Sequence, residues 1–220
     1  MVIVSKMILL RKLIKINGIY GIIIFGRIVF NKFYNLLLLK RYGIISDYSS
    51  YISGLKYMSI GSMYVGRHCR IEMITEYYGT HLNPKLKIGK NVILNDMVHI
   101  GCANYIEIGD DCLLASRIYV SDHNHGSYKG ELIDAASSLV RERNLDLDKP
   151  VIVGRNVWLG EGVSVLPGAK IGDNSIIGTN SVVIGEIPSD CIAAGIPAKV
   201  IKYYSKEEKA WIKKEINFHE

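Results

Sequence analysis

The segment that decides the fold is "VGRNVWLGEGVSVLPGAKIGDNSIIGTNSVVIGEIP", residues 153–188. Within it an aliphatic residue stands at every sixth position: Val153, Leu159, Val165, Ile171, Ile177 and Val183. The residues four positions after each of these are small or aliphatic: Val157, Val163, Ala169, Ser175, Ser181 and Ile187. A period of six is neither that of an α-helix, about 3.6, nor that of a hairpin sheet, about two. It is typical of a β-helix, in which a coil cannot bury its own apolar face and must stack on its neighbours.

The same period continues upstream with interruptions. Two blocks of three residues keep the spacing of six: Ile88, Leu94, Ile100 and then Ile108, Leu114, Val120. Two extra residues separate the blocks, around "CANYIE". Val65 and Ile71 also fit the period, whereas Ile60 to Val65 is one residue short. We therefore predict about five to six coils, at least two of them irregular. Glycines that follow the aliphatic residues are predicted to supply unusual dihedral angles at tight corners: Gly89, Gly101, Gly109, Gly154, Gly160, Gly172 and Gly178.

The rest of the chain is divided by composition. Residues 1–46 hold eight Lys or Arg and no acidic residue, and their longest uncharged run, between Lys15 and Arg27, is too short to cross a bilayer. We predict a basic, apolar arm of one or two amphipathic helices, which either lies on an anionic membrane surface or packs on the domain or between subunits. The β-helix is predicted over residues 47–203.

A short helix is predicted over residues 204–220. There Ser205 and Glu208 have the spacing of a capping box, and the segment would close the end of the prism.

Composition also limits the class of protein. A chain of 220 residues with 49% hydrophobic content fits one principal domain. Its four cysteines form no Cys-x-x-Cys pair, which favours the reducing cytoplasm over a secreted disulfide framework. The inner face of the cytoplasmic membrane is the other location that fits the arm. Nucleic-acid binding is not favoured, because the basic residues are diluted among Leu and Ile.

The repeat stops between Val120 and Val153, where residues 121–150 are inserted as a loop. The loop begins "SDHNHG", so His123 and His125 stand at its root. A long loop in a compact repeat protein is usually functional or disordered. From the residues alone, the imidazoles could form a catalytic base, a pair of metal ligands or a polar turn.

Three motifs together carry a family resemblance: "DHNHG", "NVWLG" and "AAGIPAKVI". Residues from about 50 to 203 resemble the hexapeptide-repeat acetyltransferases, which are left-handed parallel β-helices that use acetyl-CoA. Within that family the chain looks most like the O-acetyltransferases of lipopolysaccharide O-antigen and capsule biosynthesis. The resemblance implies a homotrimer with active sites between neighbouring prisms, a sugar or lipid-linked glycan acceptor, and no metal.

The resemblance also implies roles for individual residues. His123 would be the general base, and the backbone N–H of Glu161 would lie near the developing oxyanion. Asn95, His125 and Trp158 would contact the acceptor, and Asp122 belongs to the same group, where it could orient an imidazole. The residues matching the acetyl-CoA site are Trp158, Gly160, Thr179, Gly195, Lys199 and Lys202. Many relatives have Thr-Lys where this chain has Ile184 and Gly185, so one phosphate contact is expected to be missing.

Other functions remain open at this point. An N-acetyltransferase acting on an amino or nucleotide sugar would use the same fold and cofactor. A trimeric metal enzyme of the carbonic anhydrase type would use three histidines, for which His81, His99, His123 and His125 are available. A non-catalytic scaffold is a third alternative, because fold alone does not assign function.

Overall fold

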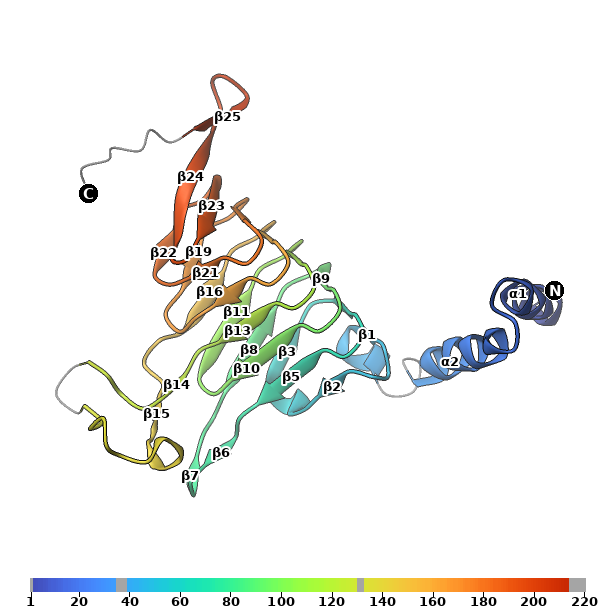
Figure 1. The fold of residues 1–220 in the computed structure, drawn as a ribbon, viewed down its shortest axis with the longest axis horizontal. Helices are drawn as coiled ribbons and strands as arrows, with labels where there is room; N and C mark the ends of the chain where they lie inside the picture. Colours follow the sequence, from blue (N-terminus) through green and yellow to red (C-terminus); the bar gives the residue numbers. More distant parts are fainter. Residues whose placement is uncertain (1, 35–38, 130–132, 214–220) are drawn as a thin grey trace.

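The computed structural model describes residues 2–34, 39–129 and 133–213. Three sheets, named here A, B and C, form the sides of a prism with two helices at one end and a hairpin at the other (Figure 1). Sheet A consists of β1 (Ile44–Ser46), β4 (Met63–Val65), β9 (Val92–Leu94), β12 (Leu113–Leu114), β17 (Trp158–Leu159), β20 (Ile176–Ile177), β23 (Cys191–Gly195), β24 (Ala198–Ser205) and β25 (Ala210–Lys213).

The other two sheets each contain six parallel strands. Sheet B consists of β2 (Tyr51–Ile52), β5 (Arg70–Met73), β10 (His99–Cys102), β13 (Tyr119–Ser121), β18 (Ser164–Val165) and β21 (Val182–Val183). Sheet C consists of β3 (Met58–Ile60), β8 (Lys85–Ile88), β11 (Tyr105–Ile108), β16 (Val151–Val153), β19 (Lys170–Ile171) and β22 (Glu186–Ile187). The chain visits A, B and C in turn, which gives six complete coils and confirms the predicted parallel β-helix.

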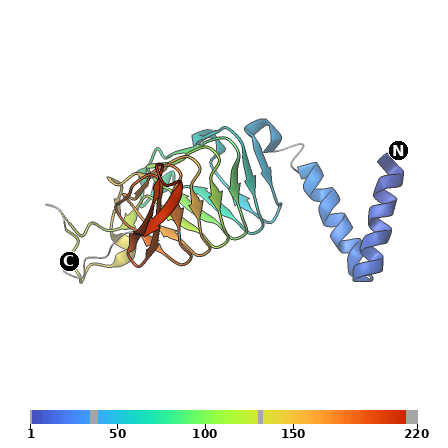
Figure 2. The ribbon, with the colours of Figure 1, turned by 90° about the horizontal axis from the view of Figure 1, so that it is seen from above.

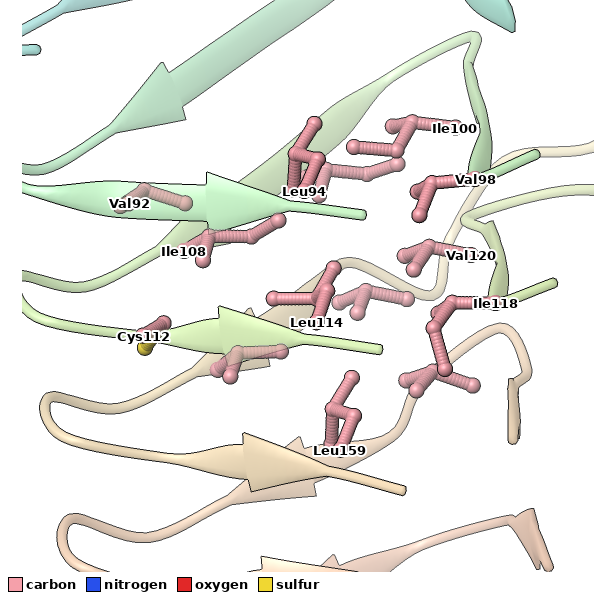
Figure 3. Packing of buried hydrophobic residues seen from close by; sticks show 14 of the residues in the cluster. Val92, Leu94, Val98, Ile100, Ile108, Cys112, Leu114, Ile118, Val120 and Leu159 are labelled. Atoms are coloured by element: carbon pink, nitrogen blue, oxygen red, sulfur yellow. The ribbon is translucent and has the colours of Figure 1, made fainter. Parts of the chain in front are cut away.

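The aliphatic residues of the hexad repeat form the core. They stack in register from coil to coil, so that Leu94, Leu114 and Leu159 lie in one column along sheet A and are fully buried (Figure 3). Val120 and Ile100 belong to the matching column of sheet B. Each buried aliphatic side chain stabilises the fold by roughly 1.5–3 kcal/mol. A strict period of six is therefore kept because a slip would turn these side chains outward.

The glycines after the aliphatic residues play a different part from the predicted one. None of the seven has a positive φ. A Cβ on Gly109 would instead lie 2.6 Å from the carbonyl oxygen of Gly154 in the next coil. Glycine is needed there because successive coils approach too closely for a side chain. Left-handed dihedrals occur at other glycines and at several Asn and Asp residues, for example Asn156 and Asn174, whose amides hydrogen-bond at 3.0 Å.

The three edges of the prism are not alike. We name the edge between sheets A and B the AB edge and the edge between B and C the BC edge. At every AB crossing the inward residues are six apart, as from Leu159 to Val165. The BC spacings in the first four coils are longer, namely 8 (Ile52 to Ile60), 17 (Ile71 to Ile88), 8 (Ile100 to Ile108) and 33 (Val120 to Val153). The irregularities noted in the sequence therefore gather mainly on one edge.

Two of these BC insertions form small hairpins. The strands β6 (Glu76–Tyr77) and β7 (Thr80–His81) pair with each other, and β14 (Asn124–His125) pairs with β15 (Leu145–Asp146). Both hairpins project from the same side of the prism (Figure 1).

The N-terminal arm forms the two helices α1 (Val2–Asn17) and α2 (Tyr20–Tyr34), as predicted. They make a V beyond the base of the prism (Figure 2). Arg27 forms a 3.0 Å ion pair with Asp47, and the rings of Phe30 and Tyr48 meet edge to face, so α2 contacts the first coil. Among the described helices, none is both long enough and apolar enough to span a membrane.

The predicted C-terminal helix is wrong within the described residues. Residues up to 213 form the antiparallel strands β24 and β25, and residues 214–220 lie outside the described part. Glu208 N–H does donate to Ser205 Oγ at 3.2 Å, as in a capping box, but the bond closes a turn. Trp211 packs edge to face on Tyr204 across the hairpin, and β24 pairs with β23. Pairing with the last strand of sheet A thus prevails over helix propensity.

Candidate active site

The imidazole of His123 lies on the BC edge, directly after β13. Its Nδ1 is 3.0 Å from Oδ1 of Asp122, and its side chain is 11% exposed. Because an ionised carboxylate only accepts hydrogen bonds, Nδ1 must carry the proton. Nε2 then holds the lone pair, and within the described residues it makes no hydrogen bond. The dyad therefore presents a base whose free nitrogen can accept a proton.

The carboxylate of Asp122 is held from below by the chain of the preceding coil. Its side chain is 0% exposed, and its two oxygens accept the backbone N–H groups of Ala103 and Asn104 at 2.9 and 2.8 Å. Burial raises the pKa of this carboxyl, but the hydrogen bonds from His123 and the two N–H groups outweigh burial and leave the pKa below its ordinary value. Asp122 is thus ionised at neutral pH.

These contacts correct the assignment of Asp122 to the substrate site. A fully buried side chain cannot contact an acceptor, whereas it can fix the ring orientation and tautomer of His123. The two N–H groups come from the "CAN" segment, where the BC crossing of that coil has two extra residues. The two extra residues that interrupt the repeat therefore belong to the segment whose N–H groups hold Asp122.

Room for the imidazole is provided by Gly101. A Cβ on this residue would lie 3.4 Å from Cε1 of His123 and 3.8 Å from Nε2 of His99. His99 is 3.5 Å from Glu72, which is also paired with Arg70. Partial burial lowers the pKa of His99, with Arg70 acting in the same direction and Glu72 opposing it. The outer face of sheet B beside the dyad is therefore polar.

The loop of residues 121–150 is anchored from inside by Arg143. This guanidinium is buried, donates to the hydroxyls of Ser138 and Tyr128 at 2.9 and 3.1 Å, and also reaches loop carbonyl groups. Asn104 Nδ2 donates to the carbonyl oxygen of Leu147 at 2.6 Å, where the loop returns to the prism. Asn104 thus contacts both the dyad and the loop.

The second loop histidine, His125, meets the β6–β7 hairpin. Tyr77 Oη is 3.0 Å from Nδ1 of His125 and donates to the carbonyl oxygen of Arg141 at 3.2 Å. The ring centroids of His123 and His125 are 6.4 Å apart. His125 is therefore near the dyad but belongs to the contact between loop and hairpin.

Another group of predicted residues lies on the AB edge. Asn95 N–H donates to Leu114, Ala115 N–H to Leu159 and Gly160 N–H to Ile177, so these corners stack in one column. Glu161 and Thr179 follow Gly160 and Gly178 in that column.

The Glu161 side chain pairs with Arg117 at 2.6 Å. The backbone N–H of Glu161 donates no hydrogen bond within the described residues.

The remaining predicted residues lie on sheet A and at its end. Trp158 is half-exposed on the outer face of β17. Gly195, at φ 107°, is the last residue of β23 before the turn to β24, and its N–H donates to Ser181 Oγ at 3.0 Å. Lys199 and Lys202 lie on β24 and form no ion pair within the described residues. Their ammonium groups are available to an anion.

The structure thus separates the predicted site into two groups. His123, Asp122 and His125 meet on the BC edge, whereas the residues named above for the AB edge and sheet A lie elsewhere on the prism. Sequence reasoning missed Tyr77, Arg143 and Asn104, which position the loop. The signal for Tyr77 was the break in the repeat between Ile71 and Ile88.

All four cysteines are buried. Burial raises the pKa of Cys69 and Cys102, and raises that of Cys112 to about 11, so these thiols are poor nucleophiles. Within residues 2–34, 39–129 and 133–213, no three His, Cys, Asp or Glu side chains gather to hold a metal ion.

Comparisons with known proteins agree with this architecture. The family "Bacterial transferase hexapeptide (six repeats)" matches residues 150–185. The chain is 44% identical over 123 residues to a protein of Escherichia coli K12 named a lipopolysaccharide biosynthesis O-acetyl transferase, WbbJ, with 56% of this chain and 63% of that protein covered. It is 36% identical over 151 residues to a Saccharomyces cerevisiae protein named an acetyltransferase, YJL218W, with 58% and 77% covered.

Among solved structures, a maltose O-acetyltransferase from Clostridium difficile 630 superposes with a TM-score of 0.54 at 29% identity. The match covers 69% of this chain and 72% of that one. The order of strands, the hexad core and these relatives lead to one conclusion: the chain belongs to the hexapeptide-repeat acetyltransferases, the family of left-handed parallel β-helices.

Proposed function

We propose that the protein is an acetyl-CoA-dependent O-acetyltransferase that modifies a sugar hydroxyl during the synthesis of a surface polysaccharide. The observation that carries this proposal is the His123–Asp122 dyad, a buried carboxylate that fixes an imidazole with its Nε2 free. The name of the Escherichia coli relative, a lipopolysaccharide O-acetyl transferase, supports the class of acceptor.

The reaction is direct transfer. Nε2 of His123 takes the proton from an acceptor hydroxyl while that oxygen attacks the carbonyl carbon of the thioester. Asp122 stabilises the imidazolium that forms. The free N–H of Glu161 donates to the oxyanion of the tetrahedral intermediate, which collapses with loss of the CoA thiolate, and the thiolate takes the proton from His123.

Acetyl-CoA is assigned to the AB edge and sheet A. Gly160, Thr179 and Gly195 line the last coils of that column, and Lys199 and Lys202 offer their ammonium groups to phosphates. Trp158 provides an exposed aromatic surface beside them. Ile184 and Gly185 add no basic group, so binding of the phosphates rests on the two lysines.

Assembly as a homotrimer would unite the two groups of residues. An apolar column runs along the outer face of sheet A through Tyr64, Ile93, Leu113 and Trp158, which are 49%, 41%, 37% and 48% exposed. Exposed apolar strips of this kind mark protein interfaces. A neighbouring prism on this face would bring one chain's BC edge toward another chain's cofactor residues.

The N-terminal arm would bring the enzyme to the inner face of the cytoplasmic membrane. Ile16, Ile23 and Phe33 on the two helices and Ile19 in the turn between them are exposed by 60–75%. No acidic residue occurs in residues 1–46. Apolar and basic groups together favour an anionic bilayer surface. Co-sedimentation with anionic vesicles should exceed that with neutral vesicles, and Ile19→Ser with Ile23→Ser should weaken it.

The experiment that tests the function is CoA release from acetyl-CoA by wild type and His123→Ala, with soluble and lipid-linked glycans as acceptors. Glycan-dependent turnover should fall on the order of 10²–10⁴-fold in His123→Ala. The matched control is His68→Asn, which removes an exposed imidazole at a left-handed turn that Asn tolerates. Turnover with amino-sugar acceptors alone would instead support N-acetylation, and near-normal activity of His123→Ala would refute the proposed base.

A further inference from the structure

A pocket of about 220 Å³ lies between the β6–β7 hairpin and the returning strand β15. The residues that line it are Tyr77, Thr80, Leu82, Asn144, Leu145 and Leu147. It is built entirely from the two insertions of the BC edge. The family resemblance assigned no role to any of these residues.

The lining combines an apolar surface with two unused polar groups. The leucines and the Tyr77 ring offer carbon surface, whereas the Thr80 hydroxyl and the Asn144 amide make no side-chain hydrogen bond within the described residues. A pyranose ring has the same two properties, an apolar face of C–H groups and a rim of hydroxyls. An amide both donates to and accepts from such hydroxyls.

Two contacts between neighbouring rings lead from the wall of the pocket toward the dyad. Tyr77, on its wall, contacts His125 with ring centroids 5.5 Å apart, and His125 lies 6.4 Å from His123 by the same measure. Within the described residues Nε2 of His125 makes no hydrogen bond. Leu147, on the opposite wall, accepts the amide of Asn104, whose backbone N–H supports Asp122. A chain lying along the edge would pass from the pocket over His125 to the base.

We propose that this pocket binds a second sugar ring of the acceptor, so that the preferred acceptor is an oligosaccharide or polymer and not a single sugar. The inference rests on the proposed O-acetyltransferase function, which it narrows. Tyr77 and Asn144 are the residues that select for acceptor length. His123 acts on one ring while the pocket holds its neighbour.

Binding of glycans without acetyl-CoA tests the pocket separately from turnover. Calorimetric titration of the full-length protein would use glucose, maltose and maltotetraose, and in parallel N-acetylglucosamine, chitobiose and chitotetraose. The wild type should bind the tetrasaccharide of one series about tenfold more tightly than the monosaccharide, which corresponds to about 1.4 kcal/mol. Equal affinity across both series would overturn the inference.

Single substitutions test whether the preference for longer glycans arises in this pocket. Asn144→Ala and Thr80→Val should each weaken binding of the tetrasaccharide about threefold to tenfold and leave the monosaccharide unchanged. Asn83→Ala is the matched control, because Asn83 is exposed next to Leu82 but lines a different pocket. His123→Ala should keep the ratio between the affinities for the tetrasaccharide and the monosaccharide, because the base does not line the pocket. If Asn144→Ala weakens both glycans equally, the residue only supports the loop and the inference fails.

Light scattering of the same variants distinguishes a second occupant. A change in oligomeric mass in Asn144→Ala or Thr80→Val would show that another copy of the chain fills the pocket, and would overturn the sugar site. Failure of the proposed function has a different signature. In that case length-dependent binding persists, but no glycan is acetylated or turnover survives in His123→Ala.

Discussion

The AB and BC edges of the prism have different chemistry because they follow different rules of spacing. The AB edge crosses from one sheet to the next in six residues in every coil, and its corners stack as a regular column. The BC edge takes up the insertions, both the two extra residues at "CAN" and the longer β6–β7 hairpin and loop of residues 121–150. A regular edge supplies repeated backbone groups for a cofactor, whereas an irregular edge can place single side chains such as His123.

The largest expected effect comes from disturbing the regular edge. One Ala inserted between Gly162 and Val163 should shift Val163 and Val165 out of the core column and prevent folding, because burial of each stabilises by roughly 1.5–3 kcal/mol. One Ala inserted between Ala136 and Ser137, on the loop of the BC edge, should leave the melting temperature within a few degrees. Circular dichroism and thermal melts of the two insertion variants measure this difference. Equal damage at both positions would contradict the distinction between the edges.

Removal of the buried carboxylate should come next. Asp122→Asn is expected to lower kcat on the order of 10²–10⁴-fold, because Asn can present an N–H to Nδ1 and favour the wrong tautomer of His123. Steady-state assays of CoA release measure this. The control is Asp190→Asn, at an αL corner, where the carboxylate accepts from Asn174 and an amide oxygen can do the same. Nearly normal kcat in Asp122→Asn would show that orientation does not matter.

A methyl group added where two coils approach closely should have a smaller effect, a partial loss of stability. Gly109→Ala places a methyl group 2.6 Å from a backbone oxygen and should reduce the free energy of unfolding by about 1–3 kcal/mol. Gly185→Ala meets no atom within 4 Å but has φ 77°, and should lose about 1 kcal/mol from backbone strain. Urea unfolding of both variants tests the order. A larger loss at Gly185 would show that backbone strain at a left-handed corner costs more than close approach between coils.

The hairpin contact should affect KM more than kcat. Tyr77→Phe keeps the ring but removes the hydrogen bonds to His125 and Arg141, and KM for the glycan should rise about threefold to tenfold. Tyr78→Phe, whose hydroxyl makes no hydrogen bond within the described residues, serves as the control. Hydrogen exchange of the loop should also accelerate only in Tyr77→Phe. Unchanged exchange would remove the hairpin from the positioning of the loop.

The smallest expected effect is the loss in acid of the stability that the Asp122 carboxylate contributes. Because the folded-state pKa of Asp122 lies below its ordinary 3.8, its ionised form stabilises the fold above that value. This stabilisation is lost as pH falls through the lower folded-state pKa. The difference in unfolding free energy between wild type and Asp122→Asn should therefore be constant from about pH 7 to pH 5 and shrink toward pH 3. A difference that grows in acid would contradict the depressed pKa.

The sequence by itself determined the core, limited the coils to about five or six, and indicated the position of the candidate base. An aliphatic residue at every sixth position is a local pattern. Each coil stacks on the next coil along the chain, so this pattern alone places the core residues, as Leu94, Leu114 and Leu159 illustrate. The C-terminal hairpin was not predictable in this way. Its residues have a capping-box spacing, and only the open edge of β23 makes a strand the better partner.

Only the tertiary structure decided how the candidate site is divided. The family motifs located His123, but they did not show that Asp122 is buried or that Ala103 and Asn104 hold it. They also placed Asn95, Glu161 and His123 in one group, although the chain carries them on two edges. The reason is physical: backbone groups some 20 residues apart become neighbours only when coils stack, and two insertions meet only when they leave the prism on the same edge.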